Sequence, residues 1–392
     1  MMAPKPVPED PMRWSGPFLC LSATVFAYQF GFAIARAIQS NFFVERLAMR
    51  PDEMGLLTTI RELPGLLMVA IAALTMRLVP THLAAFCLGL MGLGYAAYGL
   101  ATSFLTVIPG VLIASLGFHT WLTLNNAFAL ALARTSDTGQ TLGNLQAIGF
   151  AGALLAMLLV FGTVQTLGYP TSFALAGAAL LAGAAIISRF PAHLIRRDEQ
   201  RLLVRRRYLL FYVLNFLDGC RMEVFQAFGV FLLVKEYGVD VRTITLLLVI
   251  STVINMTLST PVGRLIDRLG ERVTLTGSYL ALLGLFLGLA LVRDRTLAIT
   301  LYIAYNFLLL FSMGLNTYLK RIAPSSDVRP CLAMGVTTMH ISAIILPPIG
   351  GLLWQRFGFE APFLLGAVFI ALSALITQRL PGRAAQPQPA VA

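Results

Sequence analysis

The chain has 392 residues, of which 57% are hydrophobic and only 12% are charged, and its net charge is +11. Soluble domains carry about twice this charged fraction, so the composition excludes a soluble globular enzyme and indicates an integral membrane protein with many spans. The basic residues gather in short connections between apolar runs, as membrane topology requires, and this placement argues against nucleic-acid binding.

Apolar runs long enough to cross a bilayer recur along the whole chain. A membrane helix needs about 20 predominantly apolar residues, and by that rule we predict about twelve spans. The first six lie near residues 17–39, 53–76, 83–102, 105–131, 142–166 and 172–188. The second six lie near residues 209–234, 244–262, 273–292, 297–318, 333–354 and 361–377. The predicted fold class is therefore an all-α polytopic membrane protein.

Residues 263–272, between the eighth and ninth spans, read Gly-Arg-Leu-Ile-Asp-Arg-Leu-Gly-Glu-Arg. So short a charged connection predicts a tight turn between antiparallel helices, with Gly263 and Gly270 allowing the sharp turn and close approach. We expect Asp267 to face the N-terminus of a neighbouring helix, which favours a carboxylate.

This segment resembles the signature loop of the major facilitator superfamily, G-x-L-x-D-R-x-G-x-R, at every fixed position. The resemblance implies two six-helix halves with a substrate cavity between them. It also implies a conformational latch on the cytoplasmic side, formed by Gly263, Asp267, Arg268, Gly270 and Arg272. The corresponding turn in the first half, residues 76–83, has Pro80 in place of the aspartate and lacks both glycines. Only the second half is expected to keep an intact latch.

An internal repeat relates the two sets of spans. A shift of 190 residues superposes the pairs Asn126 and Asn316, Ser136 and Ser326, Asp137 and Asp327, Leu142 and Leu332, Gly168 and Gly358, and Phe173 and Phe363. We therefore predict two pseudo-symmetric halves, residues 17–188 and 208–378, joined by a basic linker at 189–207 and flanked by tails at 1–16 and 379–392.

The distribution of Lys and Arg among the connections predicts the orientation. Arginines at 189, 196, 197, 201, 205, 206 and 207 crowd the linker, and further basic residues follow in alternate connections. Since Lys and Arg favour cytoplasmic loops, both termini and the linker are expected in the cytoplasm, with the protein in the inner membrane.

Charged residues inside the predicted spans are concentrated in the first, second and seventh: Arg36, Arg61, Glu62, Asp218, Arg221 and Glu223. An uncompensated charge at the bilayer centre costs roughly 2.5–3.5 kcal/mol, so this concentration indicates a site. Asp218 and Arg221 share one helix face and can pair, whereas Glu223 points elsewhere and is our candidate for coupling. The alternative is a set of static ion pairs that staple these helices together.

Polar stripes mark two further spans. Ser115, His119, Thr123 and Asn126 share one face of the fourth span, and the tenth span carries Tyr302, Asn306, Met313 and Asn316. By the resemblance, both spans line the cavity. His119 titrates near neutral pH and is a candidate proton carrier, although a lone histidine is more often a neutral hydrogen-bond partner. His340 in the eleventh span receives a lesser weight.

The sequence shows no nucleotide-binding loop, nucleophile or metal-ligand spacing, and its four cysteines fit no metal site. We therefore expect no enzyme activity, cofactor or metal. The predicted function is secondary active transport of a small solute by alternating access, coupled to protons, by a monomer in the lipid bilayer. Three membrane-depth arginines favour an anionic or zwitterionic solute. A multidrug or metabolite efflux pump, and a related sensor or scaffold that binds a ligand without moving it, remain alternatives.

Overall fold

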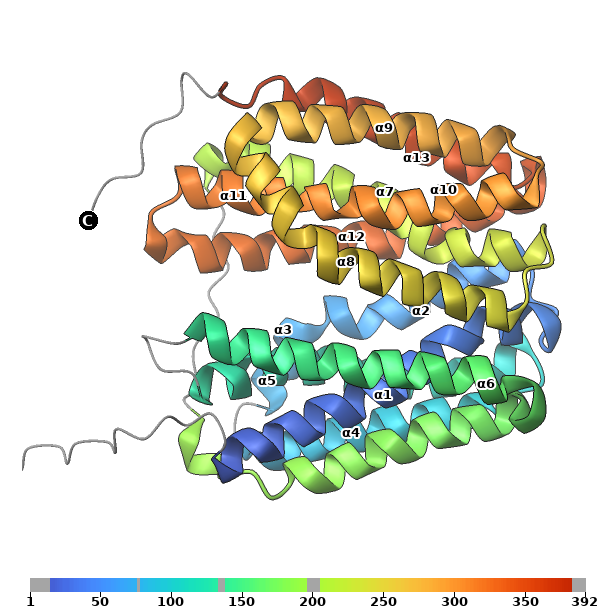
Figure 1. Ribbon diagram of the computed structural model, residues 1–392, viewed down its shortest axis with the longest axis vertical. Coiled ribbons are helices and arrows are strands. Elements are labelled where there is room, and N and C mark those ends of the chain that lie inside the picture. Colours follow the sequence, from blue (N-terminus) through green and yellow to red (C-terminus); the bar gives the residue numbers. More distant parts are fainter. Residues whose placement is uncertain (1–14, 76–77, 133–137, 196–204, 383–392) are drawn as a thin grey trace, which may run out of the picture.

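The computed structural model describes residues 15–75, 78–132, 138–195 and 205–382. All regular secondary structure in these ranges is helical, and the helices run side by side along one direction (Figure 1). Both predicted tails, apart from a few residues, and the middle of the predicted linker lie outside the described residues.

The first half of the chain forms α1 (Gly16–Glu45), α2 (Pro51–Leu66), α3 (Met68–Thr75), α4 (Pro80–Tyr98), α5 (Phe104–Leu132) and α6 (Thr138–Ile187). Within this half, α1 packs along α6, and α4 lies against both α5 and α6. Helix α6 is two spans joined at Gly168, whose backbone is not helical (φ 69°, ψ 175°).

After the short helices η2 (Ala192–Leu194) and η3 (Arg206–Tyr208), the second half forms α7 (Leu209–Lys235), α8 (Val241–Leu269), α9 (Glu271–Leu291), α10 (Arg295–Leu308), η4 (Leu309–Ser312), α11 (Met313–Ile322), α12 (Ser325–Phe357) and α13 (Glu360–Thr377). Here α13 packs against α9 and α7, and α12 lies beside α7. Helices α10, η4 and α11 together make one span.

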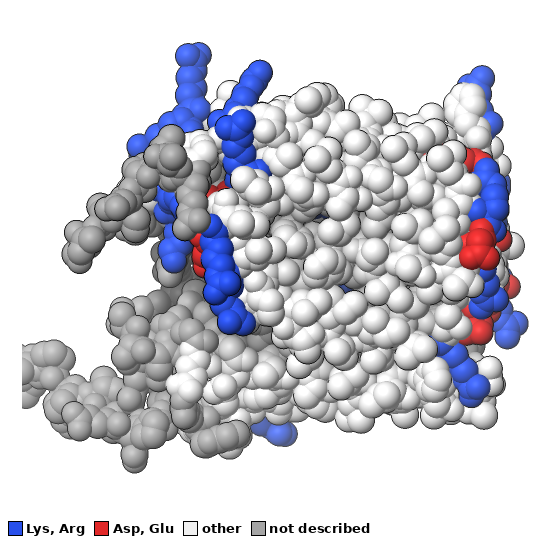
Figure 2. Space-filling view, turned by 45° about the horizontal axis from the view of Figure 1, so that its top comes forward, with Lys and Arg blue, Asp and Glu red and all other residues white. Residues whose placement is uncertain are grey.

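The predicted polytopic fold is confirmed. Nine helices in the described ranges are long and apolar enough to cross a membrane. With α6 counted as two spans, and with the broken span α2–α3 and the charged helix α7 added, the count agrees with the predicted twelve. Figure 2 shows charged side chains at the two ends of the bundle and a wide uncharged band between them.

The two ends of the bundle differ in how the halves meet. We call the end at which α1 begins and α13 ends the tail end, and the opposite end, at the α1–α2 connection, the distal end. At the distal end, Asn41 donates to the carbonyl of Val239 (2.9 Å) and Lys235 to the carbonyl of Met49 (2.9 Å). Toward the tail end, the ribbons of the two halves diverge (Figure 1). The structure is therefore closed at the distal end.

The internal repeat reappears in the backbone. Gly168 and Gly358, which the shift superposes, both have positive φ (69° and 94°) and extended ψ (175° and 169°). Residues other than glycine rarely adopt this conformation. Phe173 and Phe363, which follow at the same spacing, are both fully buried. These matches confirm the predicted pseudo-symmetry of the two halves.

The segment that resembles the signature loop is mostly helical. Helix α8 continues to Leu269, so Gly263 lies within it, and the turn occurs at Gly270 (φ 85°) alone. The prediction of a turn was correct for Gly270 and wrong for Gly263. The intervening residues are mainly Arg, Leu and Ile, which continue a helix readily, and only glycine tolerates the positive φ that ends it.

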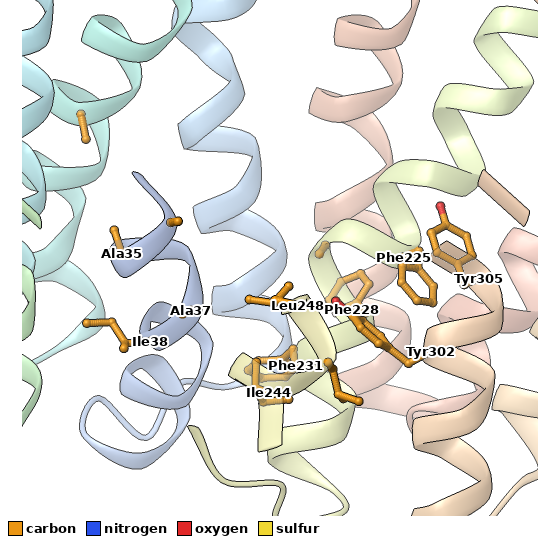
Figure 3. Packing of buried hydrophobic residues seen from close by; sticks show 14 of the residues in the cluster. Ala35, Ala37, Ile38, Phe225, Phe228, Phe231, Ile244, Leu248, Tyr302 and Tyr305 are labelled. Atoms are coloured by element: carbon orange, nitrogen blue, oxygen red, sulfur yellow. The ribbon is translucent and has the colours of Figure 1, made fainter. Parts of the chain in front are cut away.

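Aromatic packing fixes α7 against α10. Figure 3 shows Phe225 beside Tyr302 and Tyr305, with ring centroids 5.4 and 3.4 Å from that of Phe225. Phe228 and Phe231, also on α7, pack against Trp354 of α12. Stacked aromatic pairs contribute beyond the area they bury, so these rings stabilise the position of α7, which carries the charged residues, against α10 and α12.

Candidate functional site

Three side chains from three helices converge midway along the bundle. Oε2 of Glu62, on α2, lies 3.4 Å from Nε2 of His119 on α5 and 3.4 Å from Nδ1 of His340 on α12. Helices α2 and α5 belong to the first half, and α12 belongs to the second. We call these three residues the midpoint cluster. It joins the two halves through polar side chains.

The sequence of α2 makes room for the midpoint cluster. Pro64 lacks a backbone donor, and the span that we predicted as one helix over residues 53–76 is broken at Leu67, between α2 and α3. At Gly65, an added Cβ would lie 2.7 Å from His119 Nε2 and 2.8 Å from His340 Cε1. A glycine is therefore required for both imidazoles to come this close to α2.

The ring of His119 is oriented by its own helix. Its Nδ1 lies 3.1 Å from the backbone carbonyl oxygen of Ser115 and 3.1 Å from the Ser115 hydroxyl. A carbonyl oxygen only accepts, so Nδ1 carries the proton and donates it. In the neutral ring, Nε2 is then the nitrogen with the lone pair, and it lies 3.4 Å from Oε2 of Glu62. The Ser115 hydroxyl in turn donates to the carbonyl of Arg61, which ties α5 to α2.

Arg61 pairs with the other oxygen of Glu62, with 3.1 Å between Nε and Oε1. The Arg61 side chain is 33% exposed and that of His340 is 23% exposed, although both lie near the middle of their spans. A charge at this depth avoids lipid. The exposed parts of these side chains therefore face the space between the two halves.

A second charged group lies deeper in the other half. Arg221 donates from Nε to Oδ1 of Asp218 (2.8 Å) and from Nη2 to the hydroxyl of Ser312 in η4 (3.0 Å). The side chains of Asp218 and Arg221 are only 3% and 1% exposed. The spacing of three residues along α7 brings them together, as expected from helix geometry.

Glu223 lies on a different side of α7 from this pair. It is 8% exposed, and its Oε2 has no hydrogen-bond partner among the described residues. The charges that act on it come from Glu62 and Arg61 on α2 and from His340 on α12. Tyr305 of α10 and Cys220 of α7 also lie within its electrostatic reach. Glu223 therefore adjoins the midpoint cluster across the interface between the halves.

The sequence matches the family model described as Major Facilitator Superfamily, over residues 21–316 and 208–391. The chain belongs to the Major Facilitator Superfamily. No curated protein sequence matches it. This membership confirms the predicted resemblance and supports a transporter.

Solved structures from the same superfamily share its fold at low sequence identity. The nucleoside transporter NupG (D323A mutant) has a TM-score of 0.77 at 14% identity, covering 93% of this chain and 100% of that one. The D-xylose-proton symporter has a TM-score of 0.72 at 14% identity, covering 95% and 99%. A bacterial homologue of the human lysosomal transporter Spinster, in an inward-facing and occupied conformation, has a TM-score of 0.72 at 13% identity, covering 97% and 100%.

The remaining predicted site residues of this Major Facilitator Superfamily chain lie outside the midpoint cluster. Arg36 on α1 is exposed, and its charge acts on Tyr95 of α4 and on Tyr302 of α10, which places it between the halves. Asn306 donates to the carbonyl of Tyr302 (2.8 Å) on its own helix. Asn126 and Asn316, which the repeat relates, are both exposed.

The latch residues lie at the tail end. Asp267 and Arg268 are exposed at the end of α8. Arg272 at the start of α9 donates from Nη2 to Oε1 of Gln378 (3.3 Å). Between them, the buried Glu271 forms an ion pair with Arg321 of α11 (2.8 Å). The segment therefore joins three helices of the second half where the two halves are apart.

Two residues of this region, His340 and Gly65, are hard to recognise from the sequence. The local signals were a histidine in an apolar span and a glycine after a proline, and neither is specific. Nothing along the chain relates positions 62, 119 and 340, because only the packing of α2 against α5 and α12 brings them together.

Proposed function

We propose that this secondary transporter moves a small anionic or zwitterionic solute by alternating access and couples the movement to protons. The observation that carries the proposal is the exposure of arginine side chains to the space between two halves that are closed at the distal end. Family and fold support the transporter class, and the named D-xylose-proton symporter among the similar structures supports the coupling ion.

The charge of the solute follows from the arginines. Arg36 is exposed and has no ion-pair partner within the described part of the chain, and Arg61 shares Glu62 with two histidines. A guanidinium binds a carboxylate or phosphate in a planar, two-pronged geometry. An anionic group of the solute would therefore be held between Arg36 and Arg61, and Glu223 offers a partner for a cationic group of a zwitterion.

The tail end would face the cytoplasm of the inner membrane. It carries an excess of basic side chains over Asp and Glu, as Figure 2 shows at the left. At the distal end, basic residues lie beside acids, as in the pairs Arg50–Asp52 (2.9 Å) and Arg293–Glu360. The positive-inside rule supports a cytoplasmic tail end, and on this orientation the arrangement would be an inward-facing state.

Glu223 is the residue that we propose for coupling. It is buried beside groups of the other half, Arg61 and Glu62, as well as His340 of its own half. When the halves rock, the distance between the Arg61 guanidinium and the Glu223 carboxylate changes. A buried carboxylate that gains and loses a cationic neighbour switches between releasing and holding a proton.

The experiment uses purified protein in liposomes with an imposed pH difference. Solutes are first screened for collapse of the gradient by the wild-type chain, and the active solute is then used with Glu223→Gln. We expect this variant to lose accumulation of the solute against its gradient while keeping binding and exchange. Glu236→Gln, at the exposed end of the same helix, is the matched control and should accumulate normally.

Two results would contradict the proposal. Accumulation by Glu223→Gln under the pH difference would move the coupling role to another residue. Binding of a solute by the wild-type chain without any flux would favour the alternative of a sensor or scaffold.

A further inference from the structure

We propose that the midpoint cluster, Glu62, His119 and His340, is a binding site for a divalent transition-metal ion that bridges the two halves. The inference stands apart from the proposed transport function, because it concerns equilibrium binding at a defined set of atoms. The ligand class is a first-row divalent ion such as Zn²⁺, since two imidazoles and one carboxylate are the donors that such ions prefer.

The spacing of the ligand atoms leaves room for a metal ion. Glu62 Oε2 lies 3.4 Å from a nitrogen of each imidazole, and the three ligand atoms all lie within 4.8 Å of one another. Both contacts are longer than the about 2.7–2.9 Å of a strong hydrogen bond between a charged imidazole and a carboxylate. A tetrahedral zinc ion with bonds of about 2.0–2.2 Å holds neighbouring ligand atoms about 3.3–3.5 Å apart. The observed separations agree with that value.

The orientation of His119 is the one that a metal ligand adopts. Its Nδ1 donates to the carbonyl of Ser115 (3.1 Å), so in the neutral ring Nε2 carries the lone pair, and it lies 3.4 Å from the carboxylate oxygen of Glu62. The position between these two atoms suits a cation, either a proton on Nε2 or a metal ion. Metal-binding histidines commonly donate their second nitrogen to a backbone carbonyl in this way, which fixes the ring and its tautomer.

The surrounding charges leave the site open to a cation. Arg61 occupies Oε1 of Glu62 (3.1 Å) and leaves Oε2 to the histidines. The guanidinium opposes a metal ion, but the buried Glu223, which lies within electrostatic reach of both Arg61 and Glu62, offsets it when its carboxyl is ionised. Three protein ligands leave one tetrahedral position free. His340 is the most exposed of the three ligands, at 23%, so we expect the free position to be reached on its side of the cluster.

The ligands come from both halves, so the ion would act on the conformational equilibrium. Glu62 and His119 move with the first half, and His340 moves with the second. A ligand that binds one state better than the other shifts the population toward that state. Bound Zn²⁺ would therefore favour the arrangement that the structure shows, in which the distal end is closed.

The test measures Zn²⁺ binding to the full chain in detergent, purified with a tag that contains no histidine. We expect one Zn²⁺ per wild-type chain and a Zn²⁺-dependent rise in the unfolding temperature, because a ligand of the native state stabilises it. X-ray absorption should show nitrogen and oxygen ligands at about 2.0–2.2 Å and no sulfur at about 2.3 Å. The absence of sulfur excludes the free cysteines as ligands.

Variants on both sides of the interface decide whether the ion bridges it. Glu62→Gln and His340→Ala should each weaken Zn²⁺ binding by at least about 100-fold, more than loss of an outer-shell partner does. Gly65→Ala, which keeps every ligand but crowds both imidazoles, should also weaken it. His82→Ala and His193→Ala alter the two exposed histidines and should bind as the wild type does.

Each variant is compared without Zn²⁺ by its elution volume and unfolding temperature, so that a folding defect is separated from a binding defect. Wild-type affinity in a folded Glu62→Gln chain would overturn the site. Wild-type affinity in a folded His340→Ala chain would overturn the bridge between the halves. Sulfur ligands in the absorption spectrum would overturn the assignment to the midpoint cluster.

Discussion

The Asp218–Arg221 pair lies within one helix, whereas the residues of the midpoint cluster come from three helices. Asp218 and Arg221 lie on one helix, and both side chains are almost fully buried. Movement of the halves leaves the distance between Asp218 and Arg221 unchanged, because both residues belong to α7. This geometry favours the static alternative for this pair, whereas Glu62 and Glu223 lie at the interface between the halves, which the proposed transport cycle would rearrange.

Arg221→Leu should therefore destabilise the protein rather than uncouple it. Removing one partner of a buried pair leaves an uncompensated charge, which costs about 3–5 kcal/mol. We expect a clear fall in the unfolding temperature in detergent. The double variant Asp218→Leu with Arg221→Leu removes both charges and should recover most of the loss.

A full loss of transport in a double variant that unfolds at the wild-type temperature would contradict this interpretation. It would show that the pair belongs to the transport site. The Ser312→Ala variant is a milder control, because it removes one hydrogen bond to Arg221 and keeps both charges.

The sequence was sufficient for contacts within one helix. The spacing of Asp218 and Arg221 predicts their pair, because residues three apart share a face of a helix. It could not predict that Glu62 meets His119 and His340, since that contact depends on how three distant helices pack. The expectation of no metal rested on spacing along the chain, and the midpoint cluster has no such spacing.

At the scale of elements, the end of the basic linker is anchored to the start of α12. Arg205 (2.9 Å), Arg207 and the hydroxyl of Tyr208 (2.7 Å) all donate to Oδ2 of Asp327. The Tyr208 hydroxyl and then the Arg207 and Arg205 guanidiniums hold the pKa of Asp327 below its usual range. Asp327 also lies in the first turn of α12, where a carboxylate is favoured.

The lowered pKa predicts a pH dependence of stability. A carboxyl whose pKa is lower in the folded state stabilises that state fully above its unfolded pKa, and the stabilisation is lost as pH falls through the folded pKa. The unfolded pKa of Asp is about 3.9, so the contribution of Asp327 is complete at neutral pH and fades below about pH 4.

The measurement compares unfolding temperatures of the wild type and Asp327→Asn between neutral pH and about pH 3. We expect the wild type to be more stable at neutral pH, and the difference to shrink as the pH falls below about 4. A difference that stays constant with pH would show that the carboxylate charge is not what anchors the linker. Glu236→Gln, which removes an exposed carboxylate at the distal end of α7, tests whether the effect is specific to this contact.

The positions of the helices were more predictable from the sequence than the breaks within and between them. Hydrophobic length located the twelve spans, but it gave no sign that the second span breaks at Leu67 or that α8 extends to Leu269. A run of apolar residues has the same composition whether its helix is straight or broken. The breaks depend on Pro64 and Gly270, whose effects are local, and on neighbours that length cannot reveal.

At the scale of the whole molecule, the latch segment lies where the halves are apart. Asp267 is exposed in this arrangement. We expect it to contact the N-terminus of α6, near residues 141–143, only when the tail end closes, since a helix N-terminus stabilises a carboxylate. Asp267→Asn should then weaken the closed state and raise the tail-open population several-fold.

Cysteine labelling can report this population. Asn126→Cys places a thiol at an exposed position toward the tail end, and its rate of modification should rise in the Asp267→Asn background. Arg264→Gln removes a charge from the same segment at a position that the motif does not fix, and it serves as the control. An unchanged rate with Asp267→Asn would remove Asp267 from the latch.

The basic side chains at the tail end have a consequence for the surrounding lipid. On the proposed orientation they lie at the headgroups of the cytoplasmic leaflet, where anionic lipids attract each Lys or Arg by about 1 kcal/mol. Separating the halves at this end spreads Arg264, Arg268 and Lys320 away from Arg189 on the first half. If the protein alternates as we propose, the phospholipid composition of the leaflet would contribute to the free-energy difference between its two conformations, and the membrane would act as an effector of transport.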